Sequence, residues 1–172
     1  MIKNQVTIFT DGSARGNPGP GGWGAIIVYP YKDEMYVTEL GGQEVHTTNN
    51  RMELMGAIKA LEYAKGTIND LLSTIHVFSD SQYVIKGMTE WISNWQKKNW
   101  KTANKKSVLN QDLWQALSYV TKDFNIEWKY VAGHSGHTAN ERCDEIATSF
   151  ADDDPTKLFT GKTNTYKINI NA

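Results

Sequence analysis

Residues 5–10 read QVTIFT, and the stretch GSARGNPGPGGWG follows at residues 12–24. β-branched and apolar residues in the first run are typical of a strand, whereas the second run holds too many glycines and prolines for a helix. We therefore expect residues 12–24 to form a turn-rich connection. Two more strand-like runs follow, AIIVY at residues 25–29 and a similar segment at 35–40. The short links between the three runs indicate a meander of hairpins.

Helical and strand patterns alternate along the rest of the chain. Residues 49–65 have a helical period, and Asn50 followed by Glu53 resembles a capping box at its start. The run TIHVFS at residues 74–79 is apolar on both faces, as in a central strand. We also expect helices within 81–95, 107–122 and 139–151, a strand at 125–131 and a weak strand-like ending at 166–170. The order βββαβααβα predicts an α/β protein with a five-stranded mixed sheet flanked by helices.

The composition limits the class of protein. The chain has 172 residues, of which 40% are hydrophobic and 22% charged, and this is typical of one globular domain. No stretch approaches the ~18 consecutive apolar residues of a membrane span. The single cysteine, Cys143, excludes an internal disulfide and fits a reducing compartment. We therefore expect a cytoplasmic protein that is a monomer, with no membrane association and no obligate protein partner.

The distribution of charge is uneven, although the net charge is only -1. Residues 86–106 contain six lysines and one acid, a local charge of +5 that leaves -6 for the rest of the chain. A basic patch on an acidic body is typical of proteins that bind a polyanion such as nucleic acid.

Four carboxylates are candidate ligands of one shared metal site. Asp11 follows the first predicted strand and Asp80 the fourth, and active sites of open α/β sheets form beyond the carboxyl ends of strands. Glu53 lies in the first turn of a predicted helix, and Asp144 lies at the margin of the apolar stripe of the last helix. A turn, a cap or the helix dipole explains each residue alone. As a group, however, the carboxylates repel one another, and their negative charge needs a counter-charge. A divalent cation that binds oxygen ligands provides it.

Six strings occur in order along the chain and are highly specific in combination. They are TDGS at 10–13, GNPGPGGWG at 16–24, TTNNRMEL at 47–54, SDSQYV at 79–84, WISNWQKKNWKTANKK at 91–106 and GHSGHTANERCDE at 133–145. With them the sequence resembles the ribonuclease H family, type 1, of the bacterial kind. The resemblance implies a ribonuclease H-like fold, with a catalytic domain at residues 1–151 and a polar tail at 152–172 that forms no separate domain. It also implies an endonuclease that hydrolyses the RNA strand of RNA/DNA hybrids.

The resemblance further implies the catalytic residues. Asp11, Glu53, Asp80 and Asp144 match the four metal-binding carboxylates of the family, which implies two Mg²⁺ ions, with Mn²⁺ as the alternative. Two such ions about 4 Å apart activate water, neutralise charge at phosphorus and stabilise the departing oxygen. Because water is the nucleophile, we expect products with a 5'-phosphate and a 3'-hydroxyl. His134, in a glycine-flanked loop, matches a residue that transfers protons.

Substrate binding is expected from a set of polar, basic and aromatic residues. Trp91 and Trp95 have the spacing of a buried helical pair, but the lysines among them favour contact with nucleic acid. Thr48 and Asn110 match the phosphate pocket of the family, and His46 stands where the family often has arginine. The resemblance implies contacts with the hybrid from Asn17, Thr48, Asn49, Asn50, Gln82, Trp91, Trp95, Lys97, Lys98, Lys101 and Asn110. No base-specific reader is evident, so little sequence specificity is expected.

Other functions fit the sequence less well. A zinc site made of His134, His137 and Cys143 would have irregular spacing. Proofreading exonucleases typically have a second acid where this chain has Ser13, and integrase-like enzymes have a glutamate where it has Gln115. A further alternative is a metal-free ribonuclease that uses two histidines as general acid and base. Activity that survives excess EDTA would support it. A hybrid-binding protein without catalysis is the alternative from another class, but its acids would repel the phosphate backbone in the absence of metal.

Overall fold

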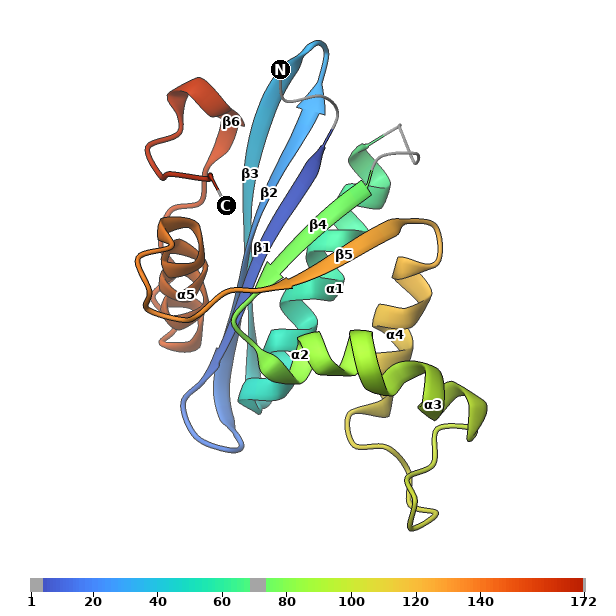
Figure 1. Ribbon diagram of the computed structural model, residues 1–172. Coiled ribbons are helices and arrows are strands. Elements are labelled where there is room, and N and C mark those ends of the chain that lie inside the picture. Colours follow the sequence, from blue (N-terminus) through green and yellow to red (C-terminus); the bar gives the residue numbers. More distant parts are fainter. Residues whose placement is uncertain (1–4, 69–73, 172) are drawn as a thin grey trace.

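The computed structural model describes residues 5–68 and 74–171 (Figure 1). A six-stranded mixed sheet with the order β5-β4-β1-β2-β3-β6 forms its centre. Antiparallel pairing joins β1 to β2 and β2 to β3, while β4 pairs in parallel with both β1 and β5. The strands are β1 (Val6–Ala14), β2 (Gly19–Tyr31), β3 (Glu34–Thr47), β4 (Thr74–Ser79), β5 (Asn125–Tyr130) and β6 (Thr160–Lys162).

Helices cover both faces of the sheet (Figure 1). On one side lie α1, α2, α3 and α4, and on the other lie α5 and the C-terminal tail. The helical elements are α1 (Asn49–Thr67), α2 (Gln82–Lys86), the π-helical turn η1 (Gly87–Trp91), α3 (Ile92–Lys97), α4 (Gln111–Thr121), α5 (Thr138–Ala151) and the 3-10 turn η2 (Thr163–Thr165). The predicted α/β class and element order are confirmed up to α5. In the part of the chain that is described, no helix is both long and apolar enough to cross a membrane.

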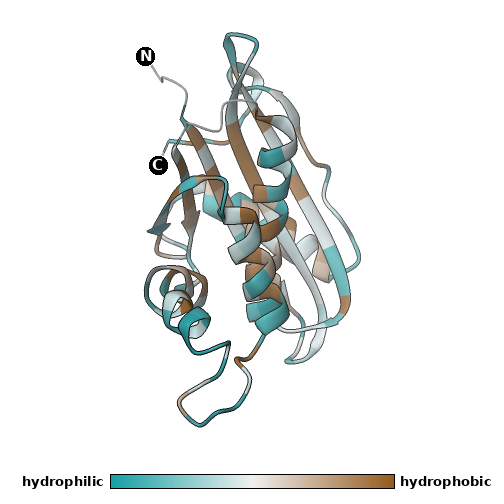
Figure 2. Cartoon of the chain, turned by 90° about the vertical axis from the view of Figure 1, so that its right-hand side faces the viewer, coloured by the Kyte–Doolittle hydropathy of each residue, from teal (hydrophilic) through white to brown (hydrophobic). Residues whose placement is uncertain are grey.

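The core divides into two clusters, one on each face of the sheet. The larger packs β1, β2 and β4 against α1 and α4, with Trp114 fully buried at its centre. The smaller packs Phe9 and Ile26 of the sheet against Cys143 of α5. Figure 2 shows the mainly hydrophilic loop that projects from the helical side beyond α3. This loop belongs to the segment in which the sequence concentrates positive charge.

The glycine-rich stretch at residues 12–24 is mostly strand, so the prediction of a turn-rich connection is wrong there. β1 continues to Ala14 and β2 begins at Gly19, which leaves a short turn between them. Two glycines of this stretch, Gly22 and Gly24, are needed for close approach of α5. A Cβ on Gly22 would lie 2.3 Å from the Ala147 carbonyl oxygen, and one on Gly24 would lie 2.5 Å from that of Cys143. Their missing side chains therefore let α5 pack directly on the sheet.

The sixth strand differs from the predicted ending at residues 166–170, which is not a strand. The short strand is instead β6, and it pairs with β3. The tail is further anchored on the buried Glu39, which accepts hydrogen bonds from the Phe159 amide at 2.9 Å and the Tyr166 hydroxyl at 2.6 Å. Arg142 of α5 contacts the same carboxylate at 2.8 Å. The tail is thus held by hydrogen bonds to Glu39 and by apolar packing of Phe159, Tyr166 and Ile170 on the smaller core cluster.

Candidate active site

The sheet brings three strand ends to one edge. β3 is antiparallel to β2 and β2 to β1, so β3, β1 and β4 all run in the same direction. The parallel register of β1 and β4 ends with Thr10 opposite Ser79. Asp80 directly follows β4, whereas Asp11 lies within β1, so the prediction that Asp11 follows the first strand is wrong. The fold therefore places these two carboxylates side by side at the carboxyl end of the sheet.

Glu53 reaches this edge through α1. The helix begins directly after β3, and its N-cap is Thr48, whose hydroxyl oxygen accepts a hydrogen bond from the Arg51 amide. The capping box predicted for Asn50 and Glu53 is therefore wrong, and Glu53 is available for another role. The helix packs so closely on β1 that a Cβ on Gly12 would lie 2.3 Å from the Glu53 amide nitrogen. This contact sets Glu53 beside Asp11.

Asp11, Glu53 and Asp80 form a compact acidic cluster. One carboxylate oxygen from each lies within 4.8 Å of the other two. Burial and then the charge of Asp80 raise the pKa of Asp11 to about 7. Burial and the charges of Asp11 and Asp80 raise the pKa of Glu53 well above its usual value. Deprotonating this cluster without a counter-charge is therefore unfavourable.

The cluster fits a divalent metal ion. Oxygen Oε2 of Glu53 is buried and has no hydrogen-bond partner among the described residues. A buried carboxylate oxygen without a donor is costly unless a cation binds it. Three carboxylates are hard oxygen donors of the kind that Mg²⁺ and Mn²⁺ prefer. The donor set, the unpartnered oxygen and the raised pKa values all suit such an ion.

Asp144 and Asn140 approach the cluster from α5. Asp144 is half-buried and is not one of the three mutually close carboxylates, but its charge contributes to the raised pKa of Asp11. Asn140, one helical turn before it, is buried and donates a hydrogen bond from Nδ2 to Asp80 Oδ2 at 3.2 Å. Our sequence analysis missed Asn140, although its spacing of four residues from Asp144 puts both on one helix face.

Several other predicted site residues are exposed polar residues in loops or at helix starts. His134 is exposed in the loop between β5 and α5, with a positive φ of 53°. Asn17 is exposed in the turn between β1 and β2. Asn49 and Asn50 are exposed as the first two residues of α1, and Gln82 is exposed as the first residue of α2. These exposed polar side chains come from four separate segments of the chain.

The tryptophans and lysines of residues 91–101 differ in exposure. Trp91 and Trp95 are half-buried, with ring centres 5.7 Å apart, and Trp95 also packs on Trp114 at 5.3 Å. The two rings are therefore partly packed in the core, as expected for a helical pair, and partly accessible to solvent. The predicted contact lysines are all exposed, and they are Lys97, Lys98 and Lys101. We call these three residues the lysine group.

Thr48 and Asn110, the predicted phosphate pocket, are both linked to Arg51. The Arg51 amide contacts Thr48 as part of the helix cap, and its guanidinium donates to Asn110 Oδ1 at 3.3 Å. His46, at the end of β3, is exposed. The sequence analysis did not single out Arg51, because its pairing with residues about 60 positions away leaves no local pattern.

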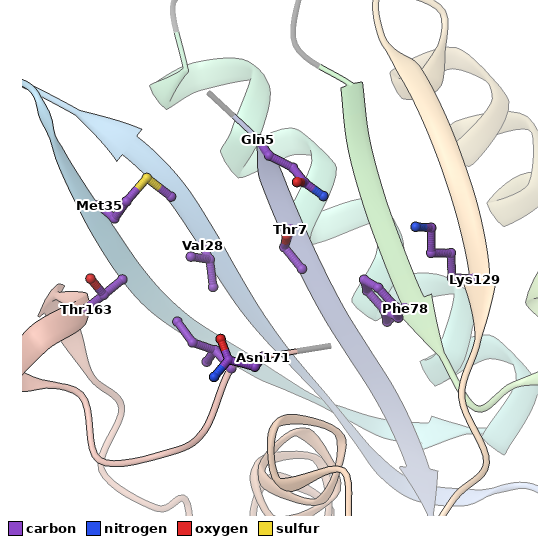
Figure 3. A pocket seen from close by; sticks show the side chains of 9 residues that line it. Gln5, Thr7, Val28, Met35, Phe78, Lys129, Thr163 and Asn171 are labelled. Carbon is purple, nitrogen blue, oxygen red and sulfur yellow. The ribbon is translucent and has the colours of Figure 1, made fainter. Parts of the chain in front are cut away.

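A cavity of about 510 Å³ lies between the sheet and the C-terminal tail (Figure 3). Its lining includes Thr7 and Phe78 from the sheet and Thr163 and Asn171 from the tail. None of its lining residues is a carboxylate, and Lys129 is the one charged side chain among them. The cavity is therefore separate from the acidic cluster.

Comparison with known proteins identifies the family. The family model for RNase H matches residues 3–152. A ribonuclease H of Escherichia coli is 52% identical over 151 residues, which cover 88% of this chain and 91% of that protein. One from Nitrosococcus oceani is 51% identical over 144 residues, or 84% and 92% of the two chains. The crystal structure of LC9-RNase H1 is 29% identical with a TM-score of 0.78, covering 94% of this chain and 79% of that one.

These similarities, together with the sheet and its acidic edge, define a nuclease of the hydrolase class. The chain belongs to the ribonuclease H family, in its bacterial type 1 form.

Proposed function

We propose that the protein is an endonuclease that hydrolyses the RNA strand of RNA/DNA hybrids with little sequence specificity. The observation that carries the proposal is the cluster of Asp11, Glu53 and Asp80 in a chain of the ribonuclease H family. The chain also shares its fold with LC11-RNase H1, whose structure was solved in complex with an RNA/DNA hybrid. The catalytic domain would comprise residues 1–151, and the protein would act as a cytoplasmic monomer.

Asp11, Glu53, Asp80 and Asp144 would hold two Mg²⁺ ions, with Mn²⁺ as the alternative. When bound, such ions supply charge neutralisation at phosphorus and lower the pKa of water. The carboxylates would supply the negative charge that binds the cations. Because Asp11 and Glu53 are buried, little bulk water would compete with them as ligands. Asn140 would keep the Asp80 carboxylate in one orientation through its 3.2 Å hydrogen bond.

His134 would transfer protons at the rim of the site. Its exposed loop position lets the imidazole reach solvent on one side and a bound substrate on the other. The lysine group and the half-buried Trp91 and Trp95 would hold the duplex through phosphate charge and ring contacts. The exposed amides Asn17, Asn49, Asn50 and Gln82 would hydrogen bond to the nucleic acid near the cleaved bond, where 2'-hydroxyls distinguish RNA from DNA.

The test is cleavage of an end-labelled RNA/DNA hybrid, with RNA alone and double-stranded RNA as controls, with Mg²⁺ and with EDTA. We expect cleavage of the RNA strand of the hybrid only, dependent on Mg²⁺, and 5'-phosphate and 3'-hydroxyl ends by mass spectrometry. A 2',3'-cyclic phosphate would exclude water as the nucleophile. Binding of the hybrid without any cleavage would instead support the non-catalytic alternative.

A further inference from the structure

Arg51 lies in the first turn of α1 and forms hydrogen bonds with Thr48, Asn110 and Asp112. Its guanidinium forms a two-pronged contact with Asp112 of α4, from Nη1 to Oδ1 at 2.9 Å and from Nη2 to Oδ2 at 2.7 Å. Nη1 also donates to Asn110 Oδ1 at 3.3 Å. A planar guanidinium held by both carboxylate oxygens has a defined direction as well as a charge. Asp112 therefore fixes the orientation in which Arg51 meets Asn110.

Asn110 occupies the N-cap position of α4, yet its side chain forms no capping hydrogen bond. Its backbone is left-handed, with φ at 58°, a conformation that asparagine tolerates better than most residues. The side-chain amide is instead held on both sides. Oδ1 accepts from Arg51, and Nδ2 donates to the Tyr83 hydroxyl at 3.1 Å, which also accepts from Trp114 Nε1 at 3.0 Å.

Thr48 and Asn110 each keep a donor beyond these contacts. The Thr48 oxygen accepts from the Arg51 amide at 3.3 Å, which leaves its hydroxyl hydrogen to donate. The Asn110 amide uses one hydrogen on Tyr83 and retains the other. The first turn of α1 carries no acid. The carboxylates of Asp112 and Glu44 do lie near Arg51, and Asp112 is paired with its guanidinium. Arg51 is thus the residue that both predicted phosphate contacts share.

We infer that Arg51, held by Asp112, is a positioning residue that orients Asn110 toward a backbone phosphate of the bound hybrid. This inference rests on the proposed function. The simpler explanation is that the Arg51–Asp112 ion pair only ties α1 to α4. The two explanations differ in what happens to substrate binding when Asp112 is removed.

The decisive variant is Asp112→Ala. Removal of a negative charge near a phosphate should by itself tighten binding of the polyanion. If Asp112 serves to aim Arg51 and through it Asn110, binding instead weakens. We expect KM for the hybrid to rise about fivefold with kcat within about twofold of the wild type, as for loss of one weak charge-assisted hydrogen bond. An unchanged or lowered KM would overturn the inference.

Asp123→Ala is a matched control. It removes the same charge and breaks an ion pair of 2.6 Å with Lys65, which joins the last turn of α1 to the residues after α4. We expect this variant to lose about as much thermal stability as Asp112→Ala and to keep the wild-type KM. Equal KM changes in both variants would show that helix tethering alone is responsible, and would contradict the inference.

Arg51→Lys separates direction from charge. Lysine keeps the positive charge but cannot hold Asp112 and Asn110 with one planar group. We expect its KM to be raised as in Asp112→Ala, whereas a wild-type KM would contradict a role in orientation. Wild-type protein that fails to cleave the hybrid would refute the proposed function itself. Wild-type protein that cleaves while Asp112→Ala and Arg51→Lys keep its KM would refute only the role of Arg51.

Discussion

The acidic cluster and the lysine group are built in opposite ways. Asp11 and Glu53 are buried, and they come from β1 and from a helix packed directly on it. The lysine group lies on exposed residues at and beyond the end of α3. Buried charges held by neighbouring elements have fixed positions, whereas exposed lysines are mobile and act through their charge. We therefore expect changes in the cluster to affect kcat and changes in the lysine group to affect KM.

The largest expected effect is that of Asp80→Asn. This substitution keeps the shape of the side chain but removes a charge that the proposed metal ions require, so we expect kcat to fall at least about 1,000-fold. Binding of the hybrid, measured in EDTA by fluorescence anisotropy, should change little. Asp154→Asn, at an exposed position of the tail, is the control and should have wild-type activity. Substantial turnover by Asp80→Asn would show that the carboxylate is dispensable.

His134→Ala should slow turnover without abolishing it. General acid–base groups typically contribute about 100-fold or more, so we expect a loss of about 100-fold in kcat with little change in KM. His137→Ala is the matched control, because His137 is also exposed and forms no capping hydrogen bond at the start of α5. Similar losses in both variants would mean that loop structure, rather than proton transfer by His134, accounts for the effect.

Replacing Lys97, Lys98 and Lys101 together by alanine should reduce the dependence of hybrid binding on salt. Three lost phosphate contacts correspond to a decrease of about 2.7 in the slope of log Kd against log salt concentration. A fourfold rise in salt should therefore weaken wild-type binding about 40-fold more than it weakens binding of the variant.

The control for the lysine group changes the same net charge at exposed positions elsewhere, with Lys32, Lys59 and Lys122 replaced by alanine. Its salt dependence should remain close to that of the wild type. If both triple variants give the same slope, the lysine group has no special part in binding, and net charge alone explains the interaction.

The last prediction concerns stability in EDTA. The folded protein raises the pKa of Asp11 from 3.8 to about 7, so it holds this proton more tightly than the unfolded chain does. Stability should therefore fall as pH rises from about 4 to about 7, and remain lower above that range. Asp11→Asn removes this penalty, and we expect it to raise the free energy of unfolding by about 4 kcal/mol at pH 8, with little gain at pH 4.

Thermal or urea unfolding at both pH values measures the difference. Addition of Mg²⁺ at pH 8 should stabilise the wild type more than Asp11→Asn, because only the wild type retains the complete carboxylate set. A variant that is less stable than the wild type at pH 8 in EDTA would contradict the raised pKa of Asp11.

The two regions also differ in how far the sequence could predict them. Asp11 and Asp80 were predicted to be neighbours because each follows a run of strand residues, although β1 in fact continues past Asp11 to Ala14. Glu53 needed the family resemblance, because in isolation it fits a helix cap. The structure shows that Thr48 caps the helix and that Gly12 lets Glu53 approach Asp11.

Long-range side-chain contacts were beyond the sequence patterns. The glycines of β2 were interpreted as turns because glycine is frequent in turns, whereas Gly22 and Gly24 make room for α5. Arg51 and Asn140 form hydrogen bonds with residues about 60 positions away, which no periodicity reveals. The polar tail, too, is attached through Glu39 and through a few separated apolar side chains that form no repeating pattern.

The central claim is that folding gathers distant carboxylates into one cation site, and anomalous diffraction from crystals soaked in Mn²⁺ tests it most directly. We predict anomalous peaks in contact with oxygen atoms of Asp11, Glu53 and Asp80. These peaks should be lost in crystals of Asp80→Asn or strongly weakened. Well-ordered crystals with no peak at these carboxylates, or with Mn²⁺ bound only elsewhere, would contradict the account.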